Sequence, residues 1–115
     1  MVTTASDGSA TAYTDKAVTG AVLSIQYVKV DFDNGVDFTI TAETTTQGLW
    51  TESNVNASAT RCPRQPTHDA AGAASLYAAT GEPVEDYIYL ANERVKFVLA
   101  QGGNAKSGTF YVTVG

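Results

Sequence analysis

The single histidine, His68, is the first residue to consider for acid–base chemistry, because the neighbouring Asp69 could orient its imidazole. Cys62 and Ser75 are the candidate nucleophiles, but no nucleophile-elbow motif surrounds either of them. Residues adjacent in sequence rarely adopt the geometry of a base and its orienting carboxylate. The sequence therefore predicts no catalytic residues, and a protein that is not an enzyme.

Asp31, Asp33, Gly35 and Asp37 lie at alternate positions and, with Asn34, loosely resemble a calcium-binding loop. The segment lacks the later bidentate glutamate and the glycine position of an EF-hand, and a solvated turn explains the same residues. One histidine and one cysteine are too few for a conventional zinc site. The glycine pair in Gln101–Asn104 lacks the helix and the Lys-Ser/Thr pair of a phosphate-binding loop. We therefore expect no metal site and no cofactor.

Cys62 has no second cysteine with which to form a disulfide inside the chain. No histidine or basic helix terminus is evident nearby that would lower the pKa of its thiol. Because a free cysteine usually behaves as a small apolar residue, we expect Cys62 to be a packing residue.

Composition and charge exclude further classes of function. The 115 residues contain 12 acidic and 7 basic side chains, a net charge of −5, which disfavours binding to the phosphates of nucleic acid. The apolar runs are only a few residues long, whereas a membrane-spanning helix needs roughly 20. Residues 1–8 carry neither the basic region nor the apolar core of a secretory signal. We expect no nucleic-acid partner, no membrane association and assembly inside a cell.

The elements that must position any functional residue are predicted to be strands, because the chain is rich in threonine and valine. Ala21–Phe32 reads as a strand whose alternation slips between Tyr27 and Val28, which indicates a bulge. Val36–Ala42 alternates apolar and polar residues like a half-buried strand. Asn34-Gly35 between them is typical of a type I′ turn, so the two segments are predicted to form a hairpin.

The last third shows the same kind of pattern. Asp86–Ala91, Val95–Leu99 and Phe110–Val114 read as strands, and the last two are predicted to form a second hairpin through the glycine-rich segment 101–108. Two hairpins of short strands favour a mainly β fold, a small antiparallel sandwich of about six to eight strands with jelly-roll or immunoglobulin-like architecture. We expect a flexible N-terminal arm at residues 1–17 and a single domain at residues 18–115.

Residues 61–83 are the least regular segment, and their two prolines exclude a regular central strand. Long connections in compact domains tend to be functional or to form interfaces. Arg61 and Arg64 lie in this segment and could pair with carboxylates of a partner, although solvated surface arginines explain them equally well.

Aromatic side chains are the other candidates for an interface, because tyrosine, tryptophan and arginine are enriched at protein contacts. Trp50 is expected either at one end of the core or as an exposed binding anchor. Tyr77, Tyr87 and Tyr89 cluster in the second half of the chain, together with Tyr111. The candidate partner interface therefore comprises Trp50, Arg61, Arg64, Tyr77, Tyr87 and Tyr89.

Several strand and turn segments, spread over about residues 18 to 115, together resemble a known family. They are Val18–Gly20, Ile25–Val28, Gly35–Glu43, Leu49–Thr51, Asn92–Lys96, Gln101–Gly103 and Gly108–Phe110. The family comprises small β-rich virion proteins from the head and head-to-tail modules of tailed bacteriophages. The resemblance carries no catalytic signature.

This resemblance implies a structural protein of the virion, assembled in the bacterial host cytoplasm. An acidic, compact sandwich of this size looks like a capsid decoration or cement protein, with the major capsid protein or other virion proteins as partners. A homo-oligomer, a dimer or a trimer, would bury the outward aromatic residues. Two alternatives remain: a neck or tail component associated with the connector, and a carbohydrate-binding module that uses Trp50 and outward tyrosines to stack on sugars.

Overall fold

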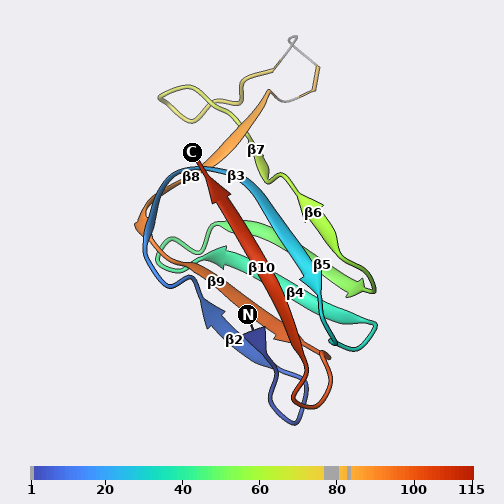
Figure 1. Cartoon of the computed structure of the whole chain (residues 1–115). Helices are drawn as coiled ribbons and strands as arrows, with labels where there is room; N and C mark the ends of the chain where they lie inside the picture. The colour runs from blue at the N-terminus through green and yellow to red at the C-terminus, as the bar shows by residue number, and fades with distance from the viewer. Residues whose placement is uncertain (1, 77–80, 83) are drawn as a thin grey trace.

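The computed structural model describes residues 2–76, 81–82 and 84–115, and Figure 1 shows an all-β molecule with two packed sheets. The prediction of a small antiparallel β-sandwich is confirmed, with ten strands instead of six to eight. They are β1 (Val2–Thr3), β2 (Ala10–Tyr13), β3 (Val18–Lys29), β4 (Val36–Ala42), β5 (Gly48–Val55), β6 (Ala59–Arg61), β7 (Arg64–Pro66), β8 (Glu85–Glu93), β9 (Val95–Ala100) and β10 (Ser107–Val114).

The larger sheet has six strands in the order β1-β10-β3-β8-β7, and β6 also pairs with β3. Strands β8 and β6 share one side of β3, because β8 pairs with its first half and β6 with its second half. The smaller sheet has four strands in the order β2-β9-β4-β5. The sandwich thus has two lateral edges, one formed by β5 and β6 and the other by β2, β10 and the short β1.

The core lies between the sheets, and the alternation predicted for the strands places it correctly. In β4 the side chains of Val36, Phe38, Ile40 and Ala42 are buried, and in β9 those of Val95, Phe97 and Leu99. Aromatic rings join the layers: Phe38 of the smaller sheet makes edge-on contacts with Trp50 and with Phe110 of the larger one, at centroid distances of 5.4 and 5.0 Å. Such pairs add to the free energy of burial.

The two predicted hairpins are wrong, although their strands are right. β3 lies in the larger sheet and β4 in the smaller one, so the segment between them crosses from sheet to sheet. Phe32 in this segment is 2% exposed and inserts into the core. Gly35 has a positive φ of 93° but Asn34 does not, so the type I′ turn, which needs both, does not form.

The second predicted hairpin is also a crossing, because β9 belongs to the smaller sheet and β10 to the larger one. The glycine-rich connection between them packs under the N-terminal residues: Gly102 donates its N–H to the carbonyl of Gly8, and Thr4 donates its hydroxyl to the carbonyl of Gly103, at 2.9 and 2.6 Å. A hairpin that was not predicted joins β4 to β5.

The N-terminal residues belong to the sandwich, whereas the sequence suggested a flexible arm at residues 1–17. β1 pairs with the start of β10, and β2 pairs through Ala10–Tyr13 with Lys96–Leu99 of β9. Ala10 and Ala12 pack against the core. The small residues of this segment form no clear apolar pattern in the sequence. Their backbone groups nevertheless add one strand to each sheet.

Two local expectations also need correction. The bulge in β3 lies at Leu23, because Thr113 pairs with Ser24 and Val114 with Val22; the ladder is regular at Tyr27 and Val28. Cys62 is exposed rather than packed, since the chain turns between β6 and β7 and buries Pro63 instead.

Candidate functional site

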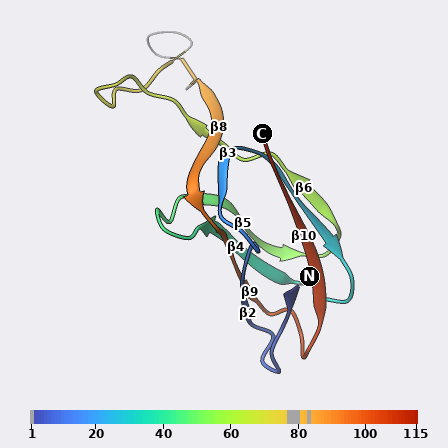
Figure 2. The same cartoon turned by 60° about the vertical axis from the view of Figure 1, so that its left-hand side comes forward.

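The segment between β7 and β8 projects from the sandwich as an arm. Strand β8 is shared: its residues Glu85–Tyr87 pair with β7, and the residues from Ile88 onward pair with β3. The described residues within 64–87 (64–76, 81–82 and 84–87), which we call the β7–β8 arm, project from the body of the sandwich in two views (Figures 1 and 2). None of the arm residues that the structure describes belongs to the buried hydrophobic cluster. The arm therefore depends on its backbone hydrogen bonds.

The outer part of the arm is ordered by one carboxylate. Oδ1 of Asp69 accepts hydrogen bonds from the backbone N–H groups of Ala71 and Ala73 at 2.9 and 3.0 Å. These bonds, that of Ala73 first, hold the pKa of Asp69 below its ordinary value. His68 does not face this carboxylate: its Nδ1 lies 3.0 Å from the backbone carbonyl oxygen of Asp69. The pair is thus a turn rather than an acid–base dyad.

Arg64 and Tyr87 face each other where the arm begins. They are opposite residues in the β7–β8 ladder, and the Arg64 guanidinium carbon lies 4.1 Å from the centroid of the Tyr87 ring, a cation–π contact. Nη1 of Arg64 also donates to the carbonyl of Pro63 at 2.9 Å. Within the described part of the chain Arg64 forms no ion pair. The guanidinium is held in place and still offers its charge to a partner.

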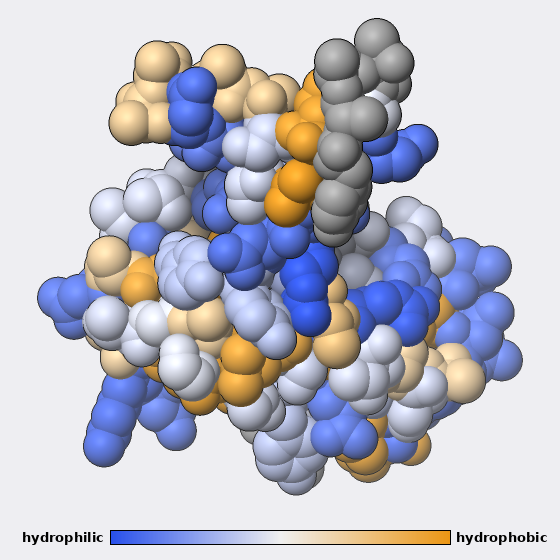
Figure 3. Space-filling model, turned by 90° about the horizontal axis from the view of Figure 1, so that it is seen from above, coloured by the Kyte–Doolittle hydropathy of each residue, from blue (hydrophilic) through white to orange (hydrophobic). Residues whose placement is uncertain are grey.

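Tyr89 lies two residues further along β8, at the base of the arm. Its side chain is 60% exposed, and its hydroxyl lies 3.5 Å from Oδ2 of Asp86. Figure 3, which looks down on the end that carries the arm, shows hydrophilic and hydrophobic residues mixed across this surface. Tyr77 falls outside the described residues. Arg64, the half-buried Tyr87 and the exposed Tyr89 therefore lie on one face of the β7–β8 ladder and its continuation, and residues of these types are enriched at protein contacts.

Trp50 and Arg61 meet elsewhere, at the lateral edge formed by β5 and β6. Trp50 is only 6% exposed and donates its indole N–H to Glu52 at 3.0 Å. Arg61 donates from Nε and Nη2 to the two carboxylate oxygens of Glu52, both at 3.0 Å, and its guanidinium lies 5.4 Å from the Trp50 ring. The cluster joins the two sheets. A buried Trp50 offers no stacking face to a sugar, which leaves the carbohydrate-binding alternative with only the outward tyrosines.

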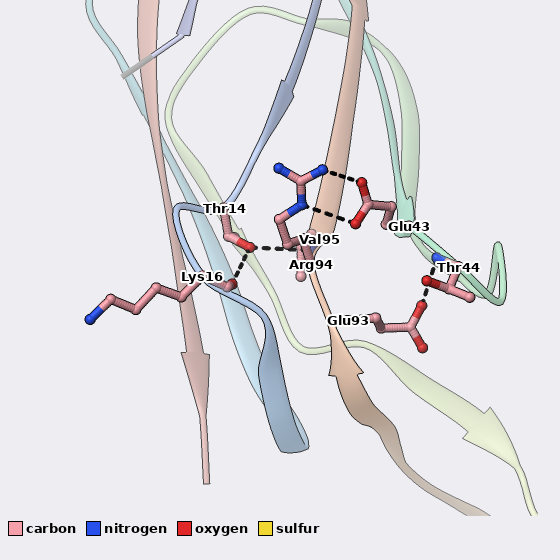
Figure 4. A network of polar contacts seen from close by, with 7 residues as sticks. All are labelled: Thr14, Lys16, Glu43, Thr44, Glu93, Arg94 and Val95. Carbon is pink, nitrogen blue, oxygen red and sulfur yellow. Dashed lines mark hydrogen bonds and ion pairs between the residues drawn. The ribbon is translucent and has the colours of Figure 1, made fainter.

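A polar network at the end of the smaller sheet was not predicted from the sequence (Figure 4). Glu93 is 6% exposed and accepts hydrogen bonds from the backbone N–H groups of Thr45 and Thr44 at 3.0 and 2.9 Å. These bonds, led by that of Thr45, hold the pKa of Glu93 below its ordinary value. Glu93 thus holds the turn between β4 and β5 by hydrogen bonds. The turn supplies hydrogen-bond donors to this carboxylate but no basic residue.

Arg94 extends this network to the opposite edge strand. It forms two hydrogen bonds with Glu43, and its guanidinium lies 4.3 Å from the ring of Tyr13 in β2. The Arg94 hydrogen bonds lower the pKa of Glu43, and Glu43 in turn raises the pKa of Arg94. The adjacent Glu93-Arg94 pair was the available signal in the sequence, but nothing local indicated which residues it would contact.

The described residues contain no group of three histidine, cysteine, aspartate or glutamate side chains that could hold a metal ion. Over the same residues, no helix is long and apolar enough to cross a membrane. Comparison with known proteins found no family model, no curated protein and no solved structure that matches the chain.

Proposed function

We propose that this chain is a non-enzymatic structural protein of a tailed-phage virion, and that it binds the outer surface of the capsid as a decoration or cement protein. The family resemblance of residues 18–115 suggests the virion. The observation that carries the proposal is the β7–β8 arm and its base, where Arg64 and Tyr87 of the arm lie beside Tyr89 of the sandwich. The partner is the major capsid protein or another virion protein.

The arm supports this role because its contacts are unlike those of the sandwich edge at Trp50. Arg61 is neutralised by Glu52 within the chain, whereas Arg64 is stacked on Tyr87 without an ion pair among the described residues. A positive group on an acidic protein favours an acidic patch of a capsid subunit. Tyr89 adds a large apolar contact that costs little conformational entropy when it is buried.

The direct test uses capsids that lack this protein, mixed with purified chain and sedimented. Replacing both Arg64→Ala and Tyr89→Ala should weaken capsid binding by about tenfold or more, because exposed arginine and tyrosine are frequent hot spots. The matched controls are Tyr89→Phe, which keeps the ring, and Val98→Ala on the outer face of β9, which removes an exposed apolar side chain far from the arm in the fold. Both controls should bind like the wild type.

Copy number separates decoration from the alternative role at the neck or tail. Quantitative mass spectrometry of purified virions should find hundreds of copies of a decoration protein, whereas a connector-associated component would be present in about six or twelve. A low copy number with labelling at one vertex would replace the capsid role by the neck role. Capsid binding that is unchanged in the Arg64→Ala, Tyr89→Ala variant would show that the arm and its base are not the contact.

A further inference from the structure

Strand β10 has one side that is paired along its length and one that is not. It pairs with β3 from Gly108 to Val114, but on its other side β1 pairs only with Ser107 and Gly108. From Thr109 to Val114 the structure describes no strand on this second side. An open strand edge is a template for pairing with another chain.

The sequence of β10 lacks two of the features that protect an edge, a charged residue and a proline. Natural sheets blunt exposed edges with charged residues, proline or bulges. Among the other edge strands, β5 contains Glu52 and β7 contains Arg64 and Pro66, whereas the short β2 has neither a charged residue nor a proline. β10 contains neither a charged residue nor a proline, in a chain whose net charge is −5. Its edge is therefore one of the few places where two like-charged copies can meet without repulsion.

A groove with both apolar and polar lining lies beside this open edge. It has a volume of about 460 Å³ between the two sheets, with Phe97 and Ala12 from the smaller sheet and Phe110 and Val112 from the larger one. Phe110, Val112 and Val114 are only partly buried, although they belong to the face that packs on the core. The core is thus incompletely covered on the side where a strand is missing.

We propose that the β10 edge binds the β10 edge of a second copy of this chain, in an antiparallel pairing centred on Val112. The row Phe110, Val112, Val114 is symmetric about its central residue, so the two-fold operation keeps all inward side chains on the core face. Phe110 then lies opposite the smaller Val114 of the second copy. Asp15 and Lys16, the two charged residues that line the groove, have opposite signs and add no net repulsion.

This pairing joins the larger sheets of two copies into one continuous sheet, and it does not depend on the proposed role in a virion. On the outer face it places Tyr111, which is 57% exposed, opposite Thr113 of the second copy. Substitutions at these two positions probe the register without disturbing the core, because both side chains point away from it.

The test is the mass of the purified chain in solution, measured by sedimentation equilibrium from micromolar to millimolar concentration. The wild type should have twice the mass of one chain, and the Tyr111→Lys, Thr113→Lys variant should be monomeric, because four positive charges would then meet at the axis. The matched control, Thr39→Lys with Val98→Lys, adds the same charge to a cross-strand pair on the outer face of the smaller sheet and should remain dimeric. Circular dichroism verifies that each variant is folded.

A second experiment tests the register. Tyr111→Lys alone and Thr113→Glu alone should each weaken self-association, and an equimolar mixture should form a heterodimer, because the new charges then lie opposite one another. Three results would overturn the proposal. The wild type could be monomeric at every concentration, or the Tyr111→Lys, Thr113→Lys variant could stay dimeric. The third is that the control variant on the smaller sheet dissociates as much as the Tyr111→Lys, Thr113→Lys variant. A monomer found with a small apolar molecule in native mass spectrometry would reassign the groove to a ligand.

Discussion

The two lateral edges of the sandwich differ in how the core between the sheets is covered. At the β5–β6 edge, Trp50 covers the core and Arg61 and Glu52 join the sheets over it. At the β2–β10 edge, Phe110 and Val112 line a groove and stay partly exposed. An edge closed by the chain's own side chains needs no partner, whereas an open edge beside an unprotected strand invites one.

The largest loss of stability is expected from a substitution of Phe38, a core residue that contacts aromatic rings from both lateral edges. Phe38 contacts Trp50 on one side and Phe110 on the other, and it is 1% exposed. Phe38→Asp would bury a carboxylate without a partner at a cost of several kcal/mol, so we expect the domain to unfold. Thr39→Asp, one residue later on the exposed face, should be tolerated. Circular dichroism of both variants measures the difference, and equal tolerance would contradict the assigned face of β4.

A matched pair of valine substitutions compares the edges directly. Val55 in β5 is 4% exposed, whereas Val112 in β10 borders the groove. Val55→Ala should lower the free energy of unfolding by about 2 kcal/mol and Val112→Ala by about 1 kcal/mol, because a partly exposed side chain loses less burial and leaves less cavity. Urea unfolding at a concentration low enough for the monomer measures both. Similar losses would mean that the β10 edge is as well covered as the other.

The ion pair at the closed edge should matter less than the apolar contacts under it. The Arg61 and Glu52 side chains are 46% and 35% exposed, so solvent screens much of their attraction. Arg61→Ala should lower the free energy of unfolding by about 1 kcal/mol, through the lost ion pair and the lost contact with the Trp50 ring. Added salt should reduce this difference. An effect as large as that of Val55→Ala would show that the ion pair, and not packing, closes the edge.

The smallest expected effect depends on pH and concerns the network that links both edge strands. The pKa of Glu93 is lower in the folded protein than its ordinary value, so its charged form stabilises the fold above the unfolded pKa of about 4.3. This contribution is lost as the pH falls through the lower, folded-state pKa. Glu93→Gln should therefore flatten the loss of stability between neutral and acidic pH. Parallel pH profiles for the variant and the wild type would contradict this.

The alternation in Val36–Ala42, Val95–Leu99 and Phe110–Val114 predicted which side chains are buried, because successive residues of a strand point to opposite faces whatever the partner is. It could not predict the partner. Asn34-Gly35 suits a tight hairpin, but the burial of Phe32 outweighs that preference and carries the chain across the core. Alternation alone places the bulge between Tyr27 and Val28, because the pairing that produces it, with the extra residue Leu23 opposite β10, is long-range.

The candidate site shows the same limits. Residue type alone predicts an interface role for Arg64, Tyr87 and Tyr89. They lie close together because β7 pairs antiparallel with the first residues of β8. Trp50 and Arg61 were named for the same reason, yet they are occupied within the chain. The sequence does not state that Glu52 lies between them, because β5 and β6 belong to different sheets.

The sequence by itself determined a β-rich, acidic chain, the inward face of its regular strands and a break in regularity at residues 61–83. These features follow from residue type and from a side-chain period of two, both local properties. Only the tertiary structure decided which strands are neighbours, which edge is closed by Trp50 and which is left open along β10. Those outcomes depend on backbone hydrogen bonds between residues far apart in the chain, and each strand presents the same backbone groups to every possible neighbour.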